Sequence, residues 1–136
     1  MSSAVASNSV VVVSANTTLR ALLELTAEEE GLKSMFFDHA QEGLNFLKDN
    51  TPRLIVLDEG IDIDPFTIAS RLKMSRRLRE VPVAMLIAEN DDKTRLTAEI
   101  SRVDHVFNKP VDRRRLSSLL RSLPAPMAQP TVDGSV

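Results

Sequence analysis

The segment Leu54-Ile55-Val56-Leu57-Asp58 decides the fold, because four apolar residues run without interruption into an aspartate. An apolar run without polar alternation is typical of a strand buried on both faces of a parallel sheet. Residues 10–13 are four valines that form a second such run and are followed by Ser14 and Ala15. A Lys109-Pro110 pair follows the last strand-like segment. Polar residues at the ends of buried strands are the first candidates for a functional site.

Strand-like and helix-like segments alternate along residues 9–123. The predicted strands are residues 9–13, 34–37, 53–58, 82–88 and 103–107. Alternation with short connections predicts right-handed crossovers, a parallel sheet and helices on both of its faces. The predicted fold class is therefore α/β, a doubly wound five-stranded parallel sheet in three layers with flavodoxin-like (βα)5 topology. In such a sheet the strand ends bring Ser14, Asp58 and Lys109 to one edge.

Local signals predict where the helices begin and end. Asn16 or Thr17 is expected to cap the first helix, and Gly31 to follow it in the left-handed conformation. Asp38 and Gln41 have the spacing of a capping box for the second helix. Asp64 is expected to cap the third helix.

The bulk composition excludes several classes of protein. The chain has 136 residues and no cysteine, so it suits one domain and rules out disulfides and thiolate zinc sites. A net charge of −2 gives no overall attraction to nucleic acid or acidic membranes. No apolar run could span a membrane and the N-terminus has no secretory pattern, so a cytoplasmic protein is expected. Residues 1–8 are predicted to be disordered, and the proline-rich residues 124–136 to be a tail or linker.

The chain resembles the receiver domain of bacterial response regulators over residues 9–123. The resemblance rests on the strand and helix alternation together with LIVLD (54–58), VPVAMLIA (81–88) and NKP (108–110) in this order. It implies an aspartate at the end of the third strand that accepts a phosphoryl group from a histidine kinase. It also implies an acid pair that helps to hold magnesium, a hydroxyl and a lysine that contact the phosphoryl group, and an aromatic switch residue on the fifth strand.

Two site positions of the family keep their residues here, and the acid pair does not. The resemblance makes Asp58 the phosphoacceptor position and Lys109 the phosphate-contact position, whereas Ser14 and Ala15 occupy the acid-pair positions. Magnesium prefers six oxygen ligands and gives up water reluctantly, so it needs carboxylates to hold it. We therefore expect magnesium binding to be weak or absent, with no cofactor and no metal site. Asp58 and Lys109 are then expected to neutralise each other as an ion pair.

The two switch positions of the family also depart from its pattern. Ile87 stands at the hydroxyl position and Val106 at the aromatic position. A conformational response requires contacts that differ between two states, and these apolar side chains are instead expected to pack together. The leading hypothesis is an atypical pseudo-receiver domain of a bacterial signal-transduction protein. It would act by protein–protein interaction, without magnesium-dependent phosphorylation and without enzymatic activity.

Other interpretations of the same residues stay open. A phosphorylatable two-component response regulator would still receive a phosphoryl group at Asp58. A nucleic-acid-binding module would use the basic residues of 71–79, although no aromatic side chain is interleaved there for stacking. A flavodoxin-like cofactor protein shares the topology, but the chain has no tryptophan or tyrosine to stack on a flavin. A cation site or a solvated loop could be formed by the acidic residues Asp58, Glu59, Asp62 and Asp64.

Charged residues on the last two predicted helices raise the question of partners. Residues 113–115 are three arginines, and the preceding helix carries Asp91, Asp92 and Glu99. Because a twofold interface uses each patch twice, a homodimer through the fourth and fifth helices is one possibility, and another protein partner is the other. We expect no membrane contact, and nucleic acid is not the favoured partner of this domain. The lone histidines His39 and His105 are not expected to bind metal.

Overall fold

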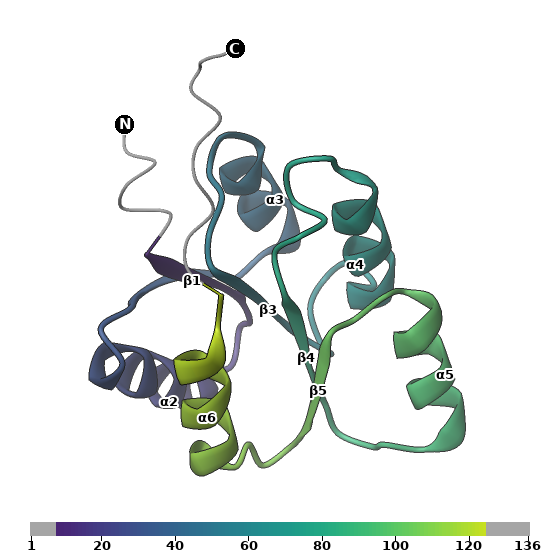
Figure 1. The fold of residues 1–136 in the computed structure, drawn as a ribbon. Coiled ribbons are helices and arrows are strands. Elements are labelled where there is room, and N and C mark those ends of the chain that lie inside the picture. Colours follow the sequence, from purple (N-terminus) through teal and green to yellow (C-terminus); the bar gives the residue numbers. More distant parts are fainter. Residues whose placement is uncertain (1–7, 125–136) are drawn as a thin grey trace.

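The computed structural model describes residues 8–124, in which five parallel strands form one sheet in the order β2-β1-β3-β4-β5 (Figure 1). The strands are β1 (Ser9–Val13), β2 (Lys33–Phe37), β3 (Leu54–Asp58), β4 (Val83–Ile87) and β5 (His105–Asn108). The predicted (βα)5 α/β fold is confirmed. The predicted disordered N-terminus and proline-rich tail lie, except for Asn8 and Pro124, outside the described residues. No described helix is long and apolar enough to cross a membrane.

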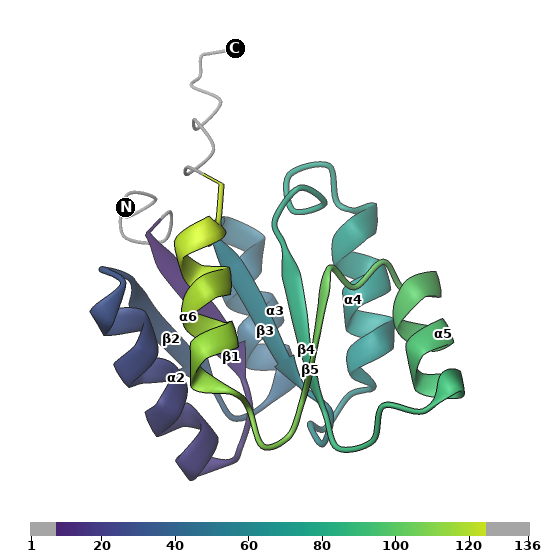
Figure 2. The ribbon, with the colours of Figure 1, turned by 60° about the horizontal axis from the view of Figure 1, so that its bottom comes forward.

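Helices cover both faces of this sheet (Figures 1 and 2). On one face lie α2 (Thr17–Glu29) and α6 (Arg113–Ser122), whose leucines pack against Val10, Val12 and Val56. On the other face lie α3 (Ala40–Asp49), α4 (Pro65–Met74) and α5 (Asp92–Ile100). The alternate strand residues, such as Val11, Ile55 and Ile87, point to that second face.

The central strands explain why their sequences are continuously apolar. Every residue of β1, β3 and β4 is buried, because helices cover both faces and neighbouring strands cover both edges. Each fully buried valine, leucine or isoleucine side chain contributes about 1.5–3 kcal/mol of hydrophobic stabilisation. The polar exceptions are Ser9 at the start of β1 and Asp58 at the end of β3, where Asp58 pairs in register with Leu86 of β4.

Most predicted helix ends are confirmed, and one is wrong. The side chain of Asn16 accepts the Leu19 N–H at 3.0 Å, and Gly31 has a left-handed φ of +77°. The capping box at Asp38 and Gln41 does not form, because Asp38 pairs with Arg20 at 2.6 Å. The N-cap of α3 is His39, whose side chain makes no cap hydrogen bond.

Helix α5 ends in the same way as α2, but with an arginine where α2 has a glycine. After α2, Gly31 N–H donates to the Glu28 carbonyl oxygen and the next N–H donates back to Ala27. After α5, Arg102 N–H donates to Glu99 at 3.1 Å and Val103 N–H to Ala98 at 3.0 Å, with a φ of 63° at Arg102. This is a Schellman motif, in which a residue with a Cβ costs about 1 kcal/mol relative to glycine.

The fifth strand begins later than predicted because of this helix end. Residues 101–104 form the turn after α5, so the strand starts at His105 instead of residue 103. Asp104 completes the turn by accepting the Val83 N–H at 2.8 Å through its carboxylate.

Candidate functional site

The carboxyl ends of the parallel strands gather the polar residues that the sequence singled out. Ser14 follows β1, Asp58 ends β3, and Lys109 follows β5. The Ser14 N–H donates to the Phe37 carbonyl and the Lys109 N–H to the Ile87 carbonyl, so both residues continue the strand ladders. The Lys109-Pro110 peptide bond is cis. The structure therefore brings these three residues together at one edge of the sheet, as expected.

Asp58 is buried, with 5% of its surface exposed, and both of its carboxylate oxygens have neighbours within the chain. The Ser14 hydroxyl donates to Asp58 Oδ2 at 2.8 Å. Lys109 Nζ lies 2.5 Å from Asp58 Oδ1, a contact of opposite charges whose angles do not make a hydrogen bond. One carboxylate thus faces one ammonium and one neutral hydroxyl.

The Ser14 hydroxyl is held in place from a second direction. Its oxygen accepts the Asn16 N–H at 3.1 Å while its hydrogen is donated to Asp58. Ser14 is fully buried, whereas Ala15 is exposed and offers no side-chain oxygen. The first acid-pair position therefore contributes a hydroxyl to Asp58, and the second contributes nothing to the site.

The two switch positions belong to the apolar interior on the side of α3 and α4. Ile87 is fully buried, and Val106 is partly buried against the same cluster. Neither side chain carries a polar atom that could follow a charge arriving at Asp58.

The acidic residues after Asp58 each bind a separate backbone N–H. Glu59 Oε1 accepts the Ala88 N–H at 2.8 Å, beyond the end of β4. Asp62 Oδ1 accepts the Ala40 N–H at 2.8 Å and so binds the first turn of α3. Asp64 caps α4 through the Phe66 N–H at 3.1 Å, as predicted. The structure therefore does not gather these carboxylates around a common point.

The Asp62 hydrogen bond has an electrostatic consequence. The Ala40 N–H lowers the pKa of the Asp62 carboxyl below its ordinary value of 3.8, and the neighbouring His39 ring lowers it further. His39 Nδ1 lies 3.3 Å from Asp62 Oδ2 at an exposed position. Within residues 8–124, no three His, Cys, Asp or Glu side chains form a group that could hold a metal ion.

The basic residues of 71–79, which a nucleic-acid-binding module would use, are partly engaged inside the molecule. Lys73 Nζ binds Asp104 at 2.7 Å and the Val81 carbonyl at 3.0 Å. The Arg77 guanidinium binds carbonyl oxygens at the C-terminal end of α3, including Asn50 at 3.0 Å and Leu47. Because these cations already have partners, fewer remain for the phosphates of a nucleic acid.

Sequence reasoning missed three contacts at this edge: Ser14 to Asp58, Glu59 to Ala88 and Asp62 to Ala40. Ser14 stood at an acid-pair position, so a polar contact with Asp58 could have been inferred from convergence of the strand ends. The contacts of Glu59 with Ala88 and of Asp62 with Ala40 join loops to distant backbone groups, and no local sequence pattern predicts them.

Residues 10–121 match the family model for the response regulator receiver domain. The chain belongs to the response regulator receiver domain family. It is 30% identical over 116 residues to the transcriptional regulatory protein AfsQ1 of Streptomyces coelicolor, covering 85% of this chain and 50% of AfsQ1. The chain thus spans about half the length of that relative. Receiver domains are parts of two-component signalling systems, so the chain is a receiver domain of a two-component system protein.

Solved structures share the fold at lower identity. The receiver domain of a signal transduction histidine kinase from Syntrophus aciditrophicus superimposes with a TM-score of 0.81 at 22% identity, covering 93% of this chain and 99% of that one. The receiver domain of the sensor histidine kinase PA1611 from Pseudomonas aeruginosa gives 0.75 at 15% identity, covering 85% and 96%. The PA1611 structure has a magnesium ion coordinated in its active-site cleft.

We predict that Lys109→Met destabilises the domain more than Asp58→Leu does. Removing the ammonium leaves a buried carboxylate uncompensated, whereas removing the carboxylate leaves a lysine that can turn to solvent. The expected cost of Lys109→Met is about 2 kcal/mol, below the usual range for a buried pair because the Lys109 side chain is 31% exposed. Urea unfolding of both single variants and the double variant measures the coupling, expected near 1 kcal/mol.

The matched control for this cycle is Lys93→Met on α5, because the Lys93 side chain is exposed and has no ion pair among residues 8–124. It should change the free energy of unfolding by less than about 0.5 kcal/mol. Strict additivity of the Asp58 and Lys109 substitutions contradicts the ion pair.

We predict an acid-dependent loss of stability that depends on Asp62. Because its pKa is lowered by folding, the ionised carboxylate stabilises the native state above the unfolded-state pKa, and this contribution is lost as the pH falls through the folded pKa. Asp62→Asn should therefore be less stable than the wild type at neutral pH, and the gap should narrow below pH 3.8. Urea unfolding from pH 7 to pH 3 tests this, with Glu24→Gln as a surface control. A gap that stays constant across this range contradicts the prediction.

Proposed function

We propose that this receiver domain is a pseudo-receiver, which acts by protein–protein contact and catalyses no phosphoryl transfer. The observation that carries the proposal is the closed arrangement at Asp58, whose two oxygens meet Ser14 and Lys109 of the same chain. A phosphoacceptor must present one carboxylate oxygen to the phosphorus atom of the donor. Here that attack requires the buried Asp58 carboxylate to give up its contact with Ser14 or with Lys109.

The residues present do not fit the magnesium ion that receiver chemistry requires. Phosphoryl transfer depends on positive charge placed on the transferring oxygens. Asp58 is the only carboxylate of the family's three that remains, and Ser14 replaces an acid with a neutral hydroxyl already committed to two hydrogen bonds. Hard divalent ions bind weakly to so few anionic ligands. We therefore derive no catalytic step through a metal.

The response side of the site supports the same proposal. Ile87 has no hydroxyl to follow a phosphoryl oxygen, and it is fully buried in a packed apolar cluster. The N–H of Ala88, next along the chain, is occupied by the Glu59 carboxylate. A phosphoryl group at Asp58 would therefore find the Ala88 N–H already bound to the negatively charged Glu59 carboxylate.

A phosphorylatable receiver is the alternative, favoured by the retention of both Asp58 and Lys109. A small phosphodonor in magnesium separates the two functions. We predict that acetyl phosphate with about 10 mM magnesium, an ion that needs several oxygen ligands, leaves the intact mass of the chain unchanged. Beryllofluoride should likewise leave the amide resonances around Asp58 unshifted.

A gain-of-ligand variant is the control for this experiment. Ser14→Asp with Ala15→Asp restores the acid pair, so this variant should bind magnesium in the millimolar range while Ala15→Asn does not. Stoichiometric phosphorylation of the unmodified chain would overturn the pseudo-receiver and establish the alternative.

We also propose that the chain pairs with a second copy through α5 and α6. Several charges expected at that interface have partners within the chain: Asp92 with Arg95, Asp91 with the Thr94 N–H, and Arg113 with Glu29. Arg115 lies over the Phe107 ring. Glu99 and Arg114 are exposed and have no ion pair within residues 8–124, so they are the pair that a twofold interface could join.

A charge exchange tests this pairing. Glu99→Lys or Arg114→Glu alone should weaken self-association up to about fivefold, since an exposed ion pair is worth about 1 kcal/mol at most. The double variant should recover it, and sedimentation velocity over a concentration series measures the effect. Arg121→Glu, on the same helix but paired with Glu30, is the matched control. A chain that stays monomeric at every concentration contradicts the proposal.

A further inference from the structure

Large apolar side chains are exposed on α4 and α5. Within residues 8–124, four large hydrophobic residues are exposed, and three of them are on these helices: Met74 at 83%, Leu96 at 57% and Ile100 at 73%. Isolated exposed hydrophobics are ordinary, but a gathered set marks a site of interaction.

Helix α5 is oriented with its large apolar residues outward. Its one buried residue is Ala98, whereas Leu96 and Ile100, four residues apart, share a face of the helix that points to solvent. A helix that only covers the sheet would bury its leucine and isoleucine and expose its small residues. This inversion leaves the apolar face of α5 without a partner in the described part of the chain.

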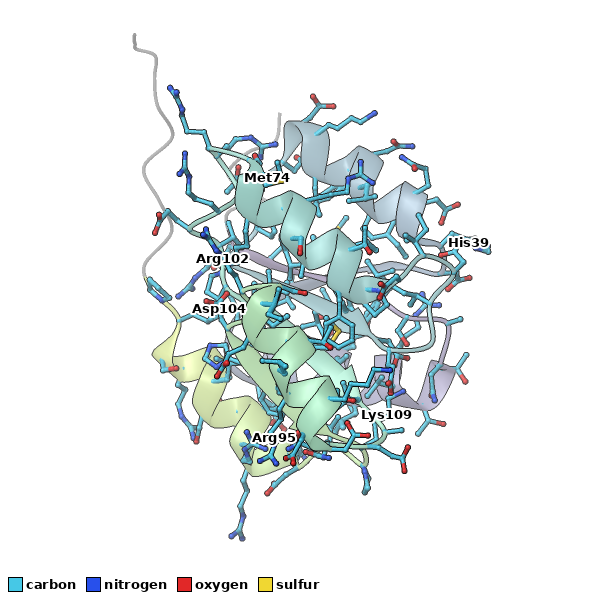
Figure 3. All side chains as sticks on the ribbon, turned by 90° about the vertical axis from the view of Figure 1, so that its right-hand side faces the viewer. His39, Met74, Arg95, Arg102, Asp104 and Lys109 are labelled. Atoms are coloured by element: carbon cyan, nitrogen blue, oxygen red, sulfur yellow. The ribbon has the colours of Figure 1, made fainter. Side chains whose placement is uncertain are left out.

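Two of the exposed residues, Met74 and Ile100, border a cleft between the two helices. Its volume is about 220 Å³, and it is lined by Ser70, Lys73, Met74, Ile100, Ser101 and Arg102. Figure 3 shows Met74 and Arg102 at the same end of α4 and α5, at the opposite side of the domain from Lys109. The cleft is therefore separate from the Asp58 site.

The side chains that line this cleft include two cations, Lys73 and Arg102, whereas the exposed Glu99 of α5 lies outside the lining. The Lys73 ammonium is neutralised by Asp104, whose carboxylate lies 2.7 Å away. Arg102 is exposed, and its guanidinium has no hydrogen bond or ion pair within residues 8–124. No carboxylate lines the cleft. An occupant that complements it must carry an apolar side chain beside a negative charge.

The backbone conformation of Arg102 costs free energy, so we expect its side chain to have a role that compensates for this cost. It holds the left-handed position that Gly31 holds at the end of α2. Residues kept in such a conformation point to a functional reason when nothing in the fold requires the side chain. At Arg102 the backbone hydrogen bonds need no side chain, and the guanidinium has no hydrogen bond or ion pair within the described residues.

We propose that Met74, Leu96, Ile100 and Arg102 form a docking surface for an acidic amphipathic helix of another protein. An apolar side chain of that helix fills the cleft between α4 and α5, and a flanking carboxylate binds the Arg102 guanidinium. Apolar anchors laid into a groove at helical spacing are a recurring mode of recognition. The surface is independent of phosphorylation at Asp58.

The probe is a pair of amidated helix-forming peptides of about 15 residues, long enough to form helix. Both carry leucines at helical spacing, one flanked by glutamates and the other by lysines. Titration into the isotope-labelled full chain should shift the amide resonances of the four docking residues with the acidic peptide only. No binding, equal binding of the lysine peptide, or shifts confined to other residues would each overturn the proposal.

Two variants separate docking from folding. Ile100→Asp should weaken the acidic peptide about tenfold or more, whereas Leu25→Asp, at a 58% exposed leucine on α2, should leave it unchanged. Arg102→Gly should weaken the peptide about fivefold and yet raise the unfolding midpoint by about 3 °C, because glycine relieves the left-handed residue. A loss of binding equal in Leu25→Asp, or unchanged binding in Arg102→Gly, contradicts the assignment.

A second copy of the chain is the competing occupant. Self-association that Ile100→Asp abolishes and Glu99→Lys leaves intact would show that this surface binds its own copy, and would overturn the acidic-helix proposal. Association sensitive only to Glu99→Lys and Arg114→Glu supports a separate dimer interface and leaves the docking surface free for its partner.

Discussion

The contact between Asp58 and Lys109 is the constraint on which the carboxyl edge of the sheet depends. A carboxylate buried at the end of β3 needs a counter-charge, and the parallel topology brings Lys109 to it from beyond β5. Ser14, which follows β1, donates a hydrogen bond to the other carboxylate oxygen. Three strands that are far apart in sequence are thereby joined at their tips. One carboxylate and one ammonium balance each other in charge here, whereas the three carboxylates of the family pattern would not be balanced by one lysine.

The elements that sequence reasoning predicted are those whose cause is local or periodic. The unbroken apolar runs of β1, β3 and β4 follow from burial on both faces, and Gly31 follows from the left-handed conformation that ends α2. The convergence of Ser14, Asp58 and Lys109 follows from the rule that parallel strands end at one edge. These features depend on few residues, and each residue has one dominant structural reason.

The contacts that the sequence could not predict are those of charged side chains for which several partners compete. Asp38 has the spacing of a cap, but Arg20 of α2 lies close enough to bind it, and Asp62 from a distant loop binds the Ala40 N–H instead. Arg77 belongs to the basic segment that could contact nucleic acid, but it binds the carbonyl oxygens at the end of α3 instead. Charged side chains have several possible partners, and only the folded geometry decides among them.

The same competition decides which charges are available to another molecule. Arg113 and Arg121 are held by the acids at the end of α2, and Lys73 is held by Asp104, so a count of arginines and lysines overstates the basic surface. Arg102, which follows α5, has no ion pair within residues 8–124. The proposed pseudo-receiver, without a switch at Asp58, would communicate through surfaces that are present all the time. Exposed apolar residues beside an unpaired cation are such a surface, since neither their position nor their charge depends on the state of the Asp58 site.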